Sequence, residues 1–477
     1  MKKDSKIRLR FAPSPTGLMH LGNVRTALMN YLFAKQKGGT FILRIEDTDP
    51  ARNFDPGAKK IMQDLEWLGL HNDEGPIFQS ERMGEYEKLR AQLEDKKLIY
   101  RCFCTSEELD RKRQRQIAMR IPPRYDKICT KLSDNEIQKN VFDGKKFIWR
   151  VTLDHTQTIV IKDLARGEIS FELKNFSDFP ITRQDGSFTF MFANFVDDML
   201  MNISHVVRGE DHLTNTAGQA YLYGLFNVPQ PIFWHLPILC NIDGKKLSKR
   251  DFGFSLGDIK QAGFLPQALL NYLAISGGGT FEQEIMSLDE LVEQFNFDIM
   301  HATGQVRYDV EKLKWLNHKW INRIDTKELM IMVRPFLAAA YPQEIETVDQ
   351  ETLIRVIDGI KTDLTVLQDA PIELEFYFKD PVVDKKDLAH YITAEYLEVI
   401  CPIINNVIQM LVFPHKFVEM FKEELKKKGV PIKYGFFYVR MALTGKPHGL
   451  GIIELVTMLG KDESEQRIQR VNWVIGL

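Results

Sequence analysis

His20-Leu21-Gly22-Asn23 is the first group of residues whose types and spacing could bind a nucleotide. The group stands where a predicted strand passes into a predicted helix, and a helix N-terminus offers unpaired N–H groups that favour phosphate. The imidazole could donate to phosphate oxygens, while the missing side chain of Gly22 would let a nucleotide lie against the backbone. Taken alone the pattern is weak, because an ordinary histidine in a strand-to-helix loop fits it equally well.

A second group is the basic segment from Gly244 to Arg250, with the sequence GKKLSKR. A run of charge is usually a solvated surface loop. Here glycine and serine accompany the lysines, which suits a mobile loop whose ammonium groups approach a triphosphate and neutralise charge that develops at the α-phosphate. The sequence has no Walker-type loop and no GxGxxG fingerprint that would offer another phosphate site.

A βαβ unit is predicted to position the first group. Apolar and basic residues alternate in Ile7–Phe11, a helical pattern ends near Gly38, and Thr40–Ile45 reads as a second strand. Such a unit implies a parallel pair with a right-handed crossover, and ligands collect at the carboxyl ends of parallel strands. We therefore expect the Pro13–Asn23 loop and the acidic Glu46–Asp49 edge to face one another across a site.

The remaining sequence divides into an insertion and a helical last third. Residues from about 100 to 190 combine a cysteine cluster with short strand-like runs such as Phe147–Val151 and Thr158–Ile161, and α/β character resumes near Asn194–Arg208. From about residue 330 strand signals fade and amphipathic helical series replace them. These series are Leu353–Leu367, Phe417–Leu425 stopped by Gly429, and Ile452–Leu459 closed by Gly460.

Composition places the chain among soluble globular proteins. A length of 477 residues with 44% hydrophobic and 27% charged residues predicts about three domains. Lys+Arg (63) and Asp+Glu (65) nearly cancel, so any nucleic-acid surface must come from local segregation of charge. Five cysteines argue against a disulfide framework and no apolar signal region follows Met1, so we expect a cytoplasmic protein. The apolar tract Tyr396–Phe413 contains Pro402 and two asparagines, which favours a buried helix over a membrane span.

Several short motifs occur together in this sequence, and their combination is more informative than any one of them alone. The sequence resembles the class I aminoacyl-tRNA synthetases, and specifically the bacterial-type glutamyl-tRNA synthetases, with two short motifs that match the HIGH and KMSKS signatures. The Pro-Ser-Pro form of the first motif separates it from glutaminyl-tRNA synthetases. The motifs that carry the resemblance span nearly the whole chain: Pro13–Gly17, His20–Asn23, Arg44–Asp49, Val207–His212, Lys246–Arg250, Gly263–Pro266, Lys312–Asn317 and Arg440–Gly445.

The resemblance implies an α/β Rossmann-like class I catalytic domain at residues 1–99 and 191–240, with a mixed α+β insertion at 100–190 that binds the acceptor stem. It further implies a stem-contact region with the KLSKR loop at 241–330 and an all-α anticodon-binding domain at 331–477. The expected reaction is ATP-dependent ligation of L-glutamate to tRNA-Glu through a glutamyl-adenylate, in the presence of Mg²⁺, by a chain that we expect to be monomeric.

The resemblance also implies residue roles that make chemical sense. Glutamate carries two carboxylates and one ammonium, so a site needs two cationic anchors and one anionic anchor. Arg10 and Arg208 would bind the carboxylates, in an order left open, and Glu46 would receive the ammonium. The further glutamate contacts would be Ala12, Ser14, Phe190 and Asn194. An ordinary structural ion pair is the alternative for each charged residue considered alone.

ATP would lie over the first motif, and the basic loop would approach its phosphates. The residues expected to carry catalysis are His20, Asn23, Lys246 and Lys249. The residues expected to bind ATP are His20, Gly22, Asp211, Lys246, Ser248 and Lys249. No protein nucleophile is needed, because positioning and charge stabilisation would supply most of the rate.

Two positions depart from the family pattern. Phe190 stands where the family usually has a tyrosine, so a hydroxyl that would help to hold substrate is missing. Cys102, Cys104 and Cys129 match three ligands of a zinc site found in some family members. The expected fourth position is Lys131, which cannot serve while protonated, whereas structural zinc normally takes four ligands. Another ligand could complete the zinc site, or the cysteines could be a relic without metal.

Several other functions stay open at this point. The nearest is a paralogue that glutamylates tRNA-Gln as well as, or instead of, tRNA-Glu. The shortened family member that glutamylates a modified tRNA base lacks an anticodon-binding domain, so the helical last third disfavours it. A tRNA-binding module without catalysis is disfavoured by His20, Glu46, Arg208 and Lys249, and a small-molecule nucleotidyltransferase would not need the helical domain.

Overall fold

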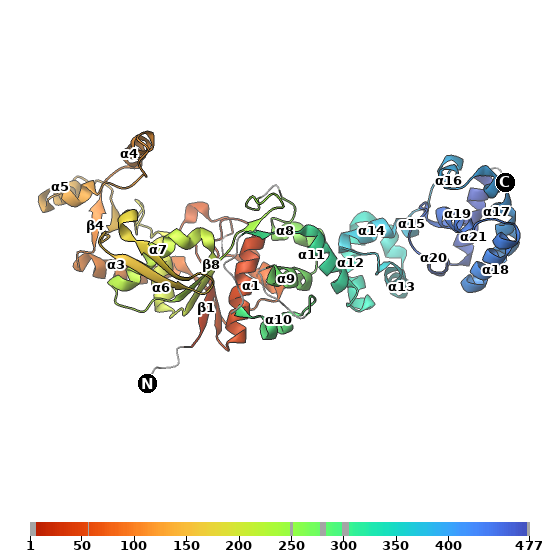
Figure 1. Ribbon diagram of the computed structural model, residues 1–477, viewed down its shortest axis with the longest axis horizontal. Helices are drawn as coiled ribbons and strands as arrows, with labels where there is room; N and C mark the ends of the chain where they lie inside the picture. Colours follow the sequence, from red (N-terminus) through yellow and green to blue (C-terminus); the bar gives the residue numbers. More distant parts are fainter. Residues whose placement is uncertain (1–5, 56, 249–250, 277–282, 298–304, 475–477) are drawn as a thin grey trace. The chain divides into compact units, whose positions relative to one another are not determined.

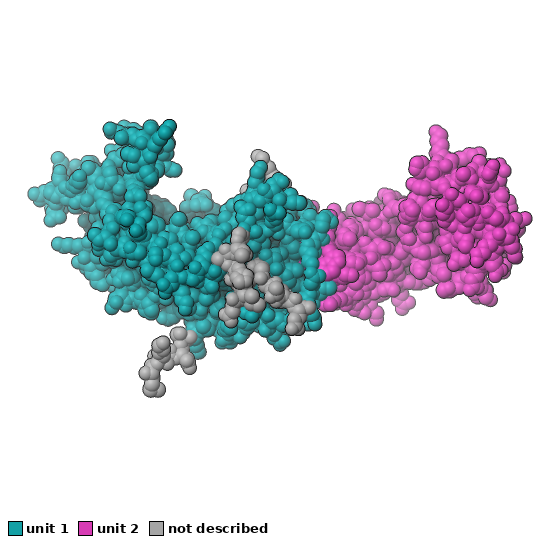
Figure 2. All heavy atoms as spheres, viewed as in Figure 1, with its two compact units in different colours: residues 1–259, 266–312 teal, residues 260–265, 313–477 magenta. Residues whose placement is uncertain are grey.

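The computed structural model describes residues 6–55, 57–248, 251–276, 283–297 and 305–474. The chain folds into two compact units, which are coloured separately in Figure 2. The first unit comprises residues 1–259 and 266–312, and the second comprises residues 260–265 and 313–477. Both predicted phosphate-binding groups therefore belong to the first unit.

A βαβ unit opens the fold and confirms the expectation from the first fifty residues (Figure 1). β1 (Arg8–Phe11) is parallel to β2 (Thr40–Ile45), and α1 (Leu21–Gln36) forms the crossover between them. β3 (Glu74–Phe78) pairs in parallel with β2 and completes a sheet in the order β1-β2-β3. Burial of apolar side chains along α1, such as Leu28, holds the helix against the strands.

A second sheet in the same unit has the strand order β7-β6-β9-β8. β8 is parallel to β9 and lies beside β1, where the Ser204 N–H donates to the Arg8 carbonyl oxygen at 3.0 Å. Helices α6 and α7 pack on each other and bury apolar side chains in the adjoining core. The bounds are β6 Thr158–Asp163, β7 Gly167–Glu172, α6 Phe190–Leu200, β8 His205–Gly209, α7 Leu213–Leu225 and β9 Ile232–Leu236.

The predicted insertion contains an antiparallel pair and two capped helices. β4 (Ile99–Cys102) pairs with β5 (Ile148–Val151), and α4 (Ser106–Ala118) and α5 (Asp134–Phe142) each begin with a capping box. The other elements of the first unit and its border are α2 Lys59–Leu68, α3 Met83–Asp95, β10 Leu239–Cys240, α8 Leu256–Gln261, α9 Pro266–Ile275, α10 Leu288–Gln294, β11 Val306–Arg307 and α11 Val310–Ile321.

The second unit is helical throughout its described residues, as the fading strand signals predict. One predicted series is wrong in length: α13 ends at Ile360, and Leu364 and Leu367 are buried beyond it in a turn and a short 3-10 helix. The helices after α11 are α12 Thr326–Ala340, α13 Gln350–Ile360, α14 Ala370–Glu373, α15 Glu375–Phe378, α16 Lys385–Tyr391, α17 Ala394–Val407, α18 Pro414–Lys427, α19 Ile432–Thr444, α20 Ile452–Leu459 and α21 Lys461–Val474.

One helical stretch among the described residues, Ala394–Val412, has the length and apolar composition that a membrane crossing needs. Its apolar side chains Leu397, Ile400 and Ile404 are buried, and α17 packs against α18 and α19. Such packing is that of a core helix in a helical domain, which agrees with the interpretation of this tract from the sequence.

Candidate functional site

A cleft of about 1010 Å³ lies at the carboxyl ends of β1, β2, β8 and β9 in the first unit. It brings together predicted residues that are up to 236 positions apart in the chain, from Arg10 to Lys246. Ser248 does not line the cleft, and Lys249 lies outside the described residues. The predicted residues that line it are Arg10, Ala12, Ser14, His20, Gly22, Asn23, Glu46, Phe190, Asn194, Arg208, Asp211 and Lys246.

The two loops that close the βαβ unit meet as the sequence predicts. The Glu46 N–H donates to the Pro13 carbonyl oxygen at 3.0 Å, and the Phe54 N–H donates to the Pro15 carbonyl oxygen at 2.7 Å. These backbone bonds fix the Pro13–Asn23 loop against the end of β2. The loop therefore forms one wall of the cleft and Glu46 forms part of its floor.

One end of the cleft, here called the imidazole end, consists of His20, Gly22, Asn23 and Lys246. His20 caps α1, because its Nδ1 accepts from the Asn23 N–H at 3.3 Å while its own N–H donates to the Asn23 side chain at 3.2 Å. Burial and the charge of Lys246 lower the pKa of His20, so the ring is neutral and Nε2 carries the proton. A Cβ at Gly22 would lie 3.0 Å from the His20 ring, so a larger residue there would press on the ring that caps α1.

The basic loop reaches the imidazole end through Lys246. Its Nζ lies 3.5 Å from Asp211 Oδ2, and the Lys246 and Asp211 side chains are 65% and 52% exposed, so the ion pair is open to solvent and weak. Ser248 instead turns to Asp251, whose Oδ2 accepts from its N–H at 2.8 Å and from its hydroxyl at 2.9 Å. The role of Ser248 toward ATP therefore stays a prediction from the motif alone.

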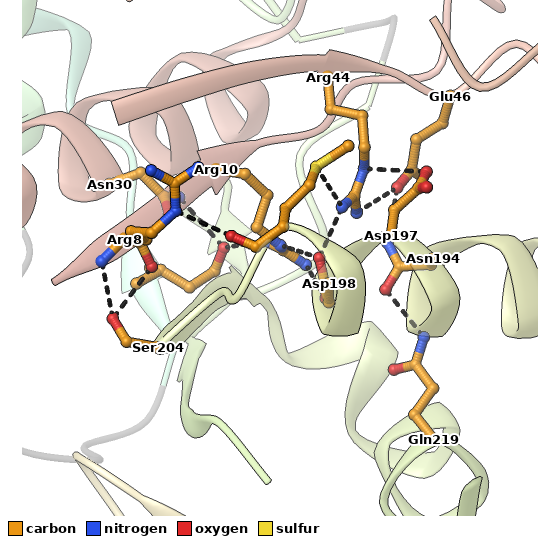
Figure 3. Close-up of polar contacts among 12 residues, drawn as sticks. Arg8, Arg10, Asn30, Arg44, Glu46, Asn194, Asp197, Asp198, Ser204 and Gln219 are labelled. Atoms are coloured by element: carbon orange, nitrogen blue, oxygen red, sulfur yellow. Dashed lines mark hydrogen bonds and ion pairs between the residues drawn. The ribbon is translucent and has the colours of Figure 1, made fainter. Parts of the chain in front are cut away.

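A second part of the cleft, here called the guanidinium end, consists of Arg10, Arg208, Glu46 and Asn194, all almost wholly buried. Arg10 is held by Asp198, with Nε 2.9 Å from Oδ1 (Figure 3). Arg208 donates from Nη2 to the Thr216 hydroxyl at 2.7 Å, and among the described residues its Nε and Nη1 have no hydrogen-bond partner. Burial and the charge of Arg10 lower the pKa of Arg208 to about 10, which leaves it charged at neutral pH.

Glu46 is fixed by two donors that face the same carboxylate oxygen. Arg44 Nη2 donates to Glu46 Oε1 at 3.1 Å, and Asn194 Nδ2 donates to it at 2.6 Å (Figure 3). Asn194 is in turn oriented by Gln219, which donates to its side-chain oxygen at 2.9 Å. Burial raises the pKa of Glu46 despite the nearby arginines, so this carboxylate gains from any further cation that approaches.

These residues belong to a set of charges that we call the arginine–carboxylate cluster. Ion pairs join Arg10, Arg44, Arg82, Glu46, Asp197 and Asp198, and Arg208 belongs to the cluster by the effect of the Asp198 and Glu46 charges on its pKa. Asp198 Oδ1 accepts from both Arg10 and Arg44, and Asp197 accepts from Arg82, Gln79 and Tyr86. Within this set four guanidinium groups face three carboxylates. The guanidinium end therefore carries one uncompensated positive charge, which a buried site tolerates only beside an anion.

Phe190 begins α6 and lines the cleft. Its ring centroid lies 5.2 Å from that of His212, at an interplanar angle of 40°. Burial and the charge of Arg208 lower the pKa of His212 to about 4, so the histidine is neutral. The surface where the family usually places a tyrosine hydroxyl is thus formed here by two uncharged rings.

Sequence reasoning missed several residues that shape the cleft. Arg25, on α1, lines the cleft and is 2% exposed, and its Nη1 donates to the Pro237 carbonyl oxygen at 2.7 Å. Arg44 was part of a recognised motif, yet its pairing with Asp198 across 154 positions had no signal in the sequence. A charged residue inside a predicted buried strand is the one clue that could have indicated such a pair.

The cysteine cluster lies within the insertion, apart from the cleft lining. The sulfurs of Cys102, Cys104 and Cys129 lie within 4.8 Å of one another and are buried. Lys131, expected at the fourth position, is exposed, whereas the Tyr125 hydroxyl lies 3.3 Å from Cys102 Sγ and 3.8 Å from Cys104 Sγ. The sequence motif did not indicate Tyr125, because a tyrosine is an uncommon zinc ligand.

Comparisons with known proteins cover nearly the whole chain. The model of the catalytic domain of class I tRNA synthetases (E and Q) matches residues 6–315, and that of an anticodon binding domain matches residues 328–472. The chain is 36% identical to the glutamate–tRNA ligase of Natranaerobius thermophilus over 98% of each chain. It is 33% identical to that of Bacillus subtilis over 98% of this chain and 100% of the relative. A crystal structure of a glutamate tRNA ligase from Elizabethkingia meningosepticum, in complex with its amino acid, is 31% identical with a TM-score of 0.86 and covers 98% of this chain and 99% of that one.

Proposed function

This chain belongs to the glutamate and glutamine group of class I tRNA synthetases, and from that premise we propose that it ligates L-glutamate to tRNA-Glu with ATP. The single observation that supports glutamate as the amino acid is the charge of the guanidinium end. The arginine–carboxylate cluster leaves one positive charge there. Glutamate at neutral pH carries a net charge of about −1, because its two carboxylates outnumber its single ammonium.

The residues of the guanidinium end can each take one group of glutamate. Arg208 offers Nε and Nη1 to a carboxylate, and Arg10 offers a second cation that Asp198 already orients. Glu46 offers a carboxylate to the ammonium, and Ser14, Ala12 and Asn194 lie around it. Glutamine would bring no net charge to the same end and would leave the positive charge buried and unpaired, which is costly.

Activation would take place where the two ends of the cleft meet. The α-carboxylate of glutamate attacks the α-phosphorus of ATP, the P–O bond to the β-phosphate breaks, and pyrophosphate leaves with magnesium as part of the nucleotide substrate. His20 Nε2–H, the N–H groups at the start of α1 and Lys246 would bind the phosphates, with Asn23 holding His20. Lys249 joins them as a proposal from the KLSKR motif. A ribose hydroxyl of the terminal tRNA nucleotide then attacks the mixed anhydride and releases AMP.

The rest of the chain would bind tRNA. We assign the acceptor stem to the insertion at 100–190 and to the region at 241–330, and the anticodon to the helices of residues 331–477, which the anticodon-binding family model matches from residue 328. We expect a cytoplasmic monomer. No observation on the described residues favours tRNA-Gln as the acceptor, so this alternative is left to the assay below.

Zinc is proposed as a structural metal of the insertion. Three cysteine sulfurs within 4.8 Å of one another supply three of the four donors that structural zinc normally takes, and we propose the Tyr125 hydroxyl, 3.3 Å from Cys102 Sγ, as the fourth. When bound, the metal would fix the segment around Cys129 to the end of β4 and would take no part in ligation. Metal analysis of purified wild type and Tyr125→Phe tests this: about one zinc per wild-type chain is expected, and a metal-free wild type would refute the site.

Aminoacylation with glutamate and with glutamine, each against purified tRNA-Glu and tRNA-Gln, tests the function. We expect stable product only from glutamate, with tRNA-Glu as the better acceptor. Glutaminyl product, or no product from any of the four pairings, would overturn the proposal. Efficient glutamylation of tRNA-Gln would instead support the alternative that this protein charges tRNA-Gln as well as tRNA-Glu.

A further inference from the structure

A line of three buried polar side chains extends from Arg208 away from the cleft. Arg208 Nη2 lies 2.7 Å from the Thr216 hydroxyl, which lies 2.8 Å from His235 Nε2, and His235 Nδ1 lies 2.7 Å from Asp163 Oδ2. None of the three line the cleft, and each is at most 1% exposed. We call Thr216, His235 and Asp163 the Arg208 chain.

The direction of each hydrogen bond in the Arg208 chain can be worked out. Burial would raise the pKa of Asp163, but hydrogen bonds from the His235 side chain and from the backbone N–H groups of Ala165 and His235 lower it, so Asp163 is a carboxylate and accepts from His235 Nδ1–H. Burial lowers the pKa of His235, so the ring is neutral and its Nε2 has no proton. Nε2 therefore accepts from the Thr216 hydroxyl, whose oxygen presents a lone pair to Arg208.

We propose that Thr216, His235 and Asp163 are positioning residues that orient the Arg208 guanidinium toward a carboxylate of glutamate. The inference rests on the proposed function. Among the described residues Thr216 is the hydrogen-bond partner of Arg208, so the hydroxyl occupies Nη2 and leaves Nε and Nη1 to donate to substrate. The two members next to Arg208, Thr216 and His235, are uncharged, so they orient the guanidinium without adding a positive group beside it.

The supports of the Arg208 chain come from separate rigid elements. Thr216 is on α7, His235 on β9 and Asp163 at the end of β6, and the N–H groups of Ala165 and Arg166 donate to Asp163 Oδ1 at 2.9 and 3.0 Å. A fixed carboxylate at the far end therefore determines the His235 ring orientation and its tautomer. The Thr216 hydroxyl could otherwise donate to the His212 carbonyl oxygen at 3.2 Å, but His235 Nε2, at 2.8 Å, is the nearer of its two possible acceptors.

Thr216→Val and Thr216→Ser form the central test, because valine keeps the shape of threonine and loses the hydroxyl, while serine keeps the hydroxyl. In aminoacylation of tRNA-Glu we expect Thr216→Val to raise the glutamate KM roughly tenfold, since a charge-assisted bond positions Arg208. The ATP KM and the melting temperature should change little, and Thr216→Ser should recover most of the affinity. Thr214→Val, an exposed position on the same helix, is the matched control.

His235 gives an independent readout. His235→Gln can place its side-chain amide where Nε2 contacts Thr216, whereas His235→Asn can place it where Nδ1 contacts Asp163. Because the contact with Thr216 is the one that orients Arg208, we expect a lower glutamate KM in the glutamine variant than in the asparagine variant. A glutamate KM within twofold of wild type in Thr216→Val, or equal losses in glutamate and ATP KM, would overturn the inference. If wild type itself fails to charge tRNA-Glu with glutamate, the proposed function fails instead.

Discussion

At the guanidinium end of the cleft Arg10 and Arg208 are 3% and 6% exposed, whereas at the imidazole end the Lys246 side chain is 65% exposed. Each charged group of the guanidinium end has a partner that arrives from another element, such as Asp198 on α6 for Arg10 on β1. Lys246 has one solvent-open pair with Asp211. The first end is thus set before substrate arrives, and the second is free to rearrange around the nucleotide.

The difference in burial between the two ends determines whether each end contributes to substrate binding or to the rate of reaction. A buried, pre-oriented guanidinium costs little reorganisation when it binds a carboxylate, and the low dielectric strengthens the contact. An exposed ammonium contributes little to ground-state binding but can follow charge as it moves onto the leaving pyrophosphate. We therefore expect changes at the guanidinium end to act on glutamate affinity, and changes at the imidazole end to act on the rate of activation.

Arg208→Ala should give the largest effect on activity. It removes a buried cation with two unpaired nitrogens, and each charge-assisted hydrogen bond is worth about 1.5–3 kcal/mol, so kcat/KM for glutamate should fall roughly 10²- to 10⁴-fold. Steady-state aminoacylation with varied glutamate and varied ATP measures this, and the ATP KM should stay within about threefold. Arg8→Ala, on β1 outside the cleft lining, is the control. A similar fall in kcat/KM for glutamate in that variant would contradict a specific role of the guanidinium end.

Asp198→Asn should give the largest effect on stability. The substitution leaves Arg10 and Arg44 buried without their shared carboxylate, and breaking a buried pair from one side costs about 3–5 kcal/mol. Burial alone would raise the pKa of Asp198, but Arg10 and Arg44 hold it below its usual value. The stability that the carboxylate supplies is therefore present above the unfolded pKa of about 3.9 and is lost as the pH falls through the lower folded pKa.

Denaturant unfolding of the wild type and of Asp198→Asn at several pH values checks both statements. The difference between the two proteins should be full at pH 7 and should shrink below about pH 4, as the wild-type carboxylate takes up its proton. A difference that is constant down to pH 3 would mean that the charge of Asp198 is not what stabilises the cluster.

Lys246→Ala should have a smaller effect, and it should change the rate of glutamate activation rather than the affinity for glutamate. Because the ammonium is exposed in the free protein, its loss should leave the glutamate KM nearly unchanged and lower the rate of glutamate activation about 10- to 100-fold, equivalent to a charge-assisted contact in the transition state. Pyrophosphate exchange in the presence of tRNA measures the activation step. Lys245→Ala, the neighbouring basic residue that does not line the cleft, should be nearly silent.

The imidazole end was predictable from the sequence to a greater extent than the guanidinium end. His20, Gly22 and Asn23 act within one turn of one helix, so a short motif contains both the cap and the open backbone. Arg10 and Arg208 could be named from the resemblance, but their orientation depends on Asp198 and Thr216, which come from other elements. Contacts between residues far apart in the chain leave no local period in the sequence.

The same reasoning explains the one error outside the cleft. The spacing of Leu364 and Leu367 continues the apolar series of α13, yet the helix ends at Ile360, because burial of an apolar residue does not require a helical backbone. The cysteine motif was also incomplete as a description of its surroundings: Lys131, at the family's fourth ligand position, is exposed, and the Tyr125 hydroxyl lies 3.3 Å from Cys102 Sγ. Spacing along the chain indicated that the three cysteines come together, but not which other side chain lies beside them.

Phe190→Tyr should have the smallest effect, and it sharpens the contrast because it tests which of the two ends the Phe190 ring acts on. The new hydroxyl would stand in the cleft beside His212 and could donate to a substrate carboxylate, so we expect the glutamate KM to fall about threefold to tenfold with kcat nearly unchanged. Glutamate titrations at saturating ATP and tRNA-Glu measure it, with the ATP KM as the internal control. A change in the ATP KM alone would assign this ring to the imidazole end. An unchanged glutamate KM would mean that the guanidinium end already supplies enough donors, so that a neutral hydroxyl adds nothing to binding.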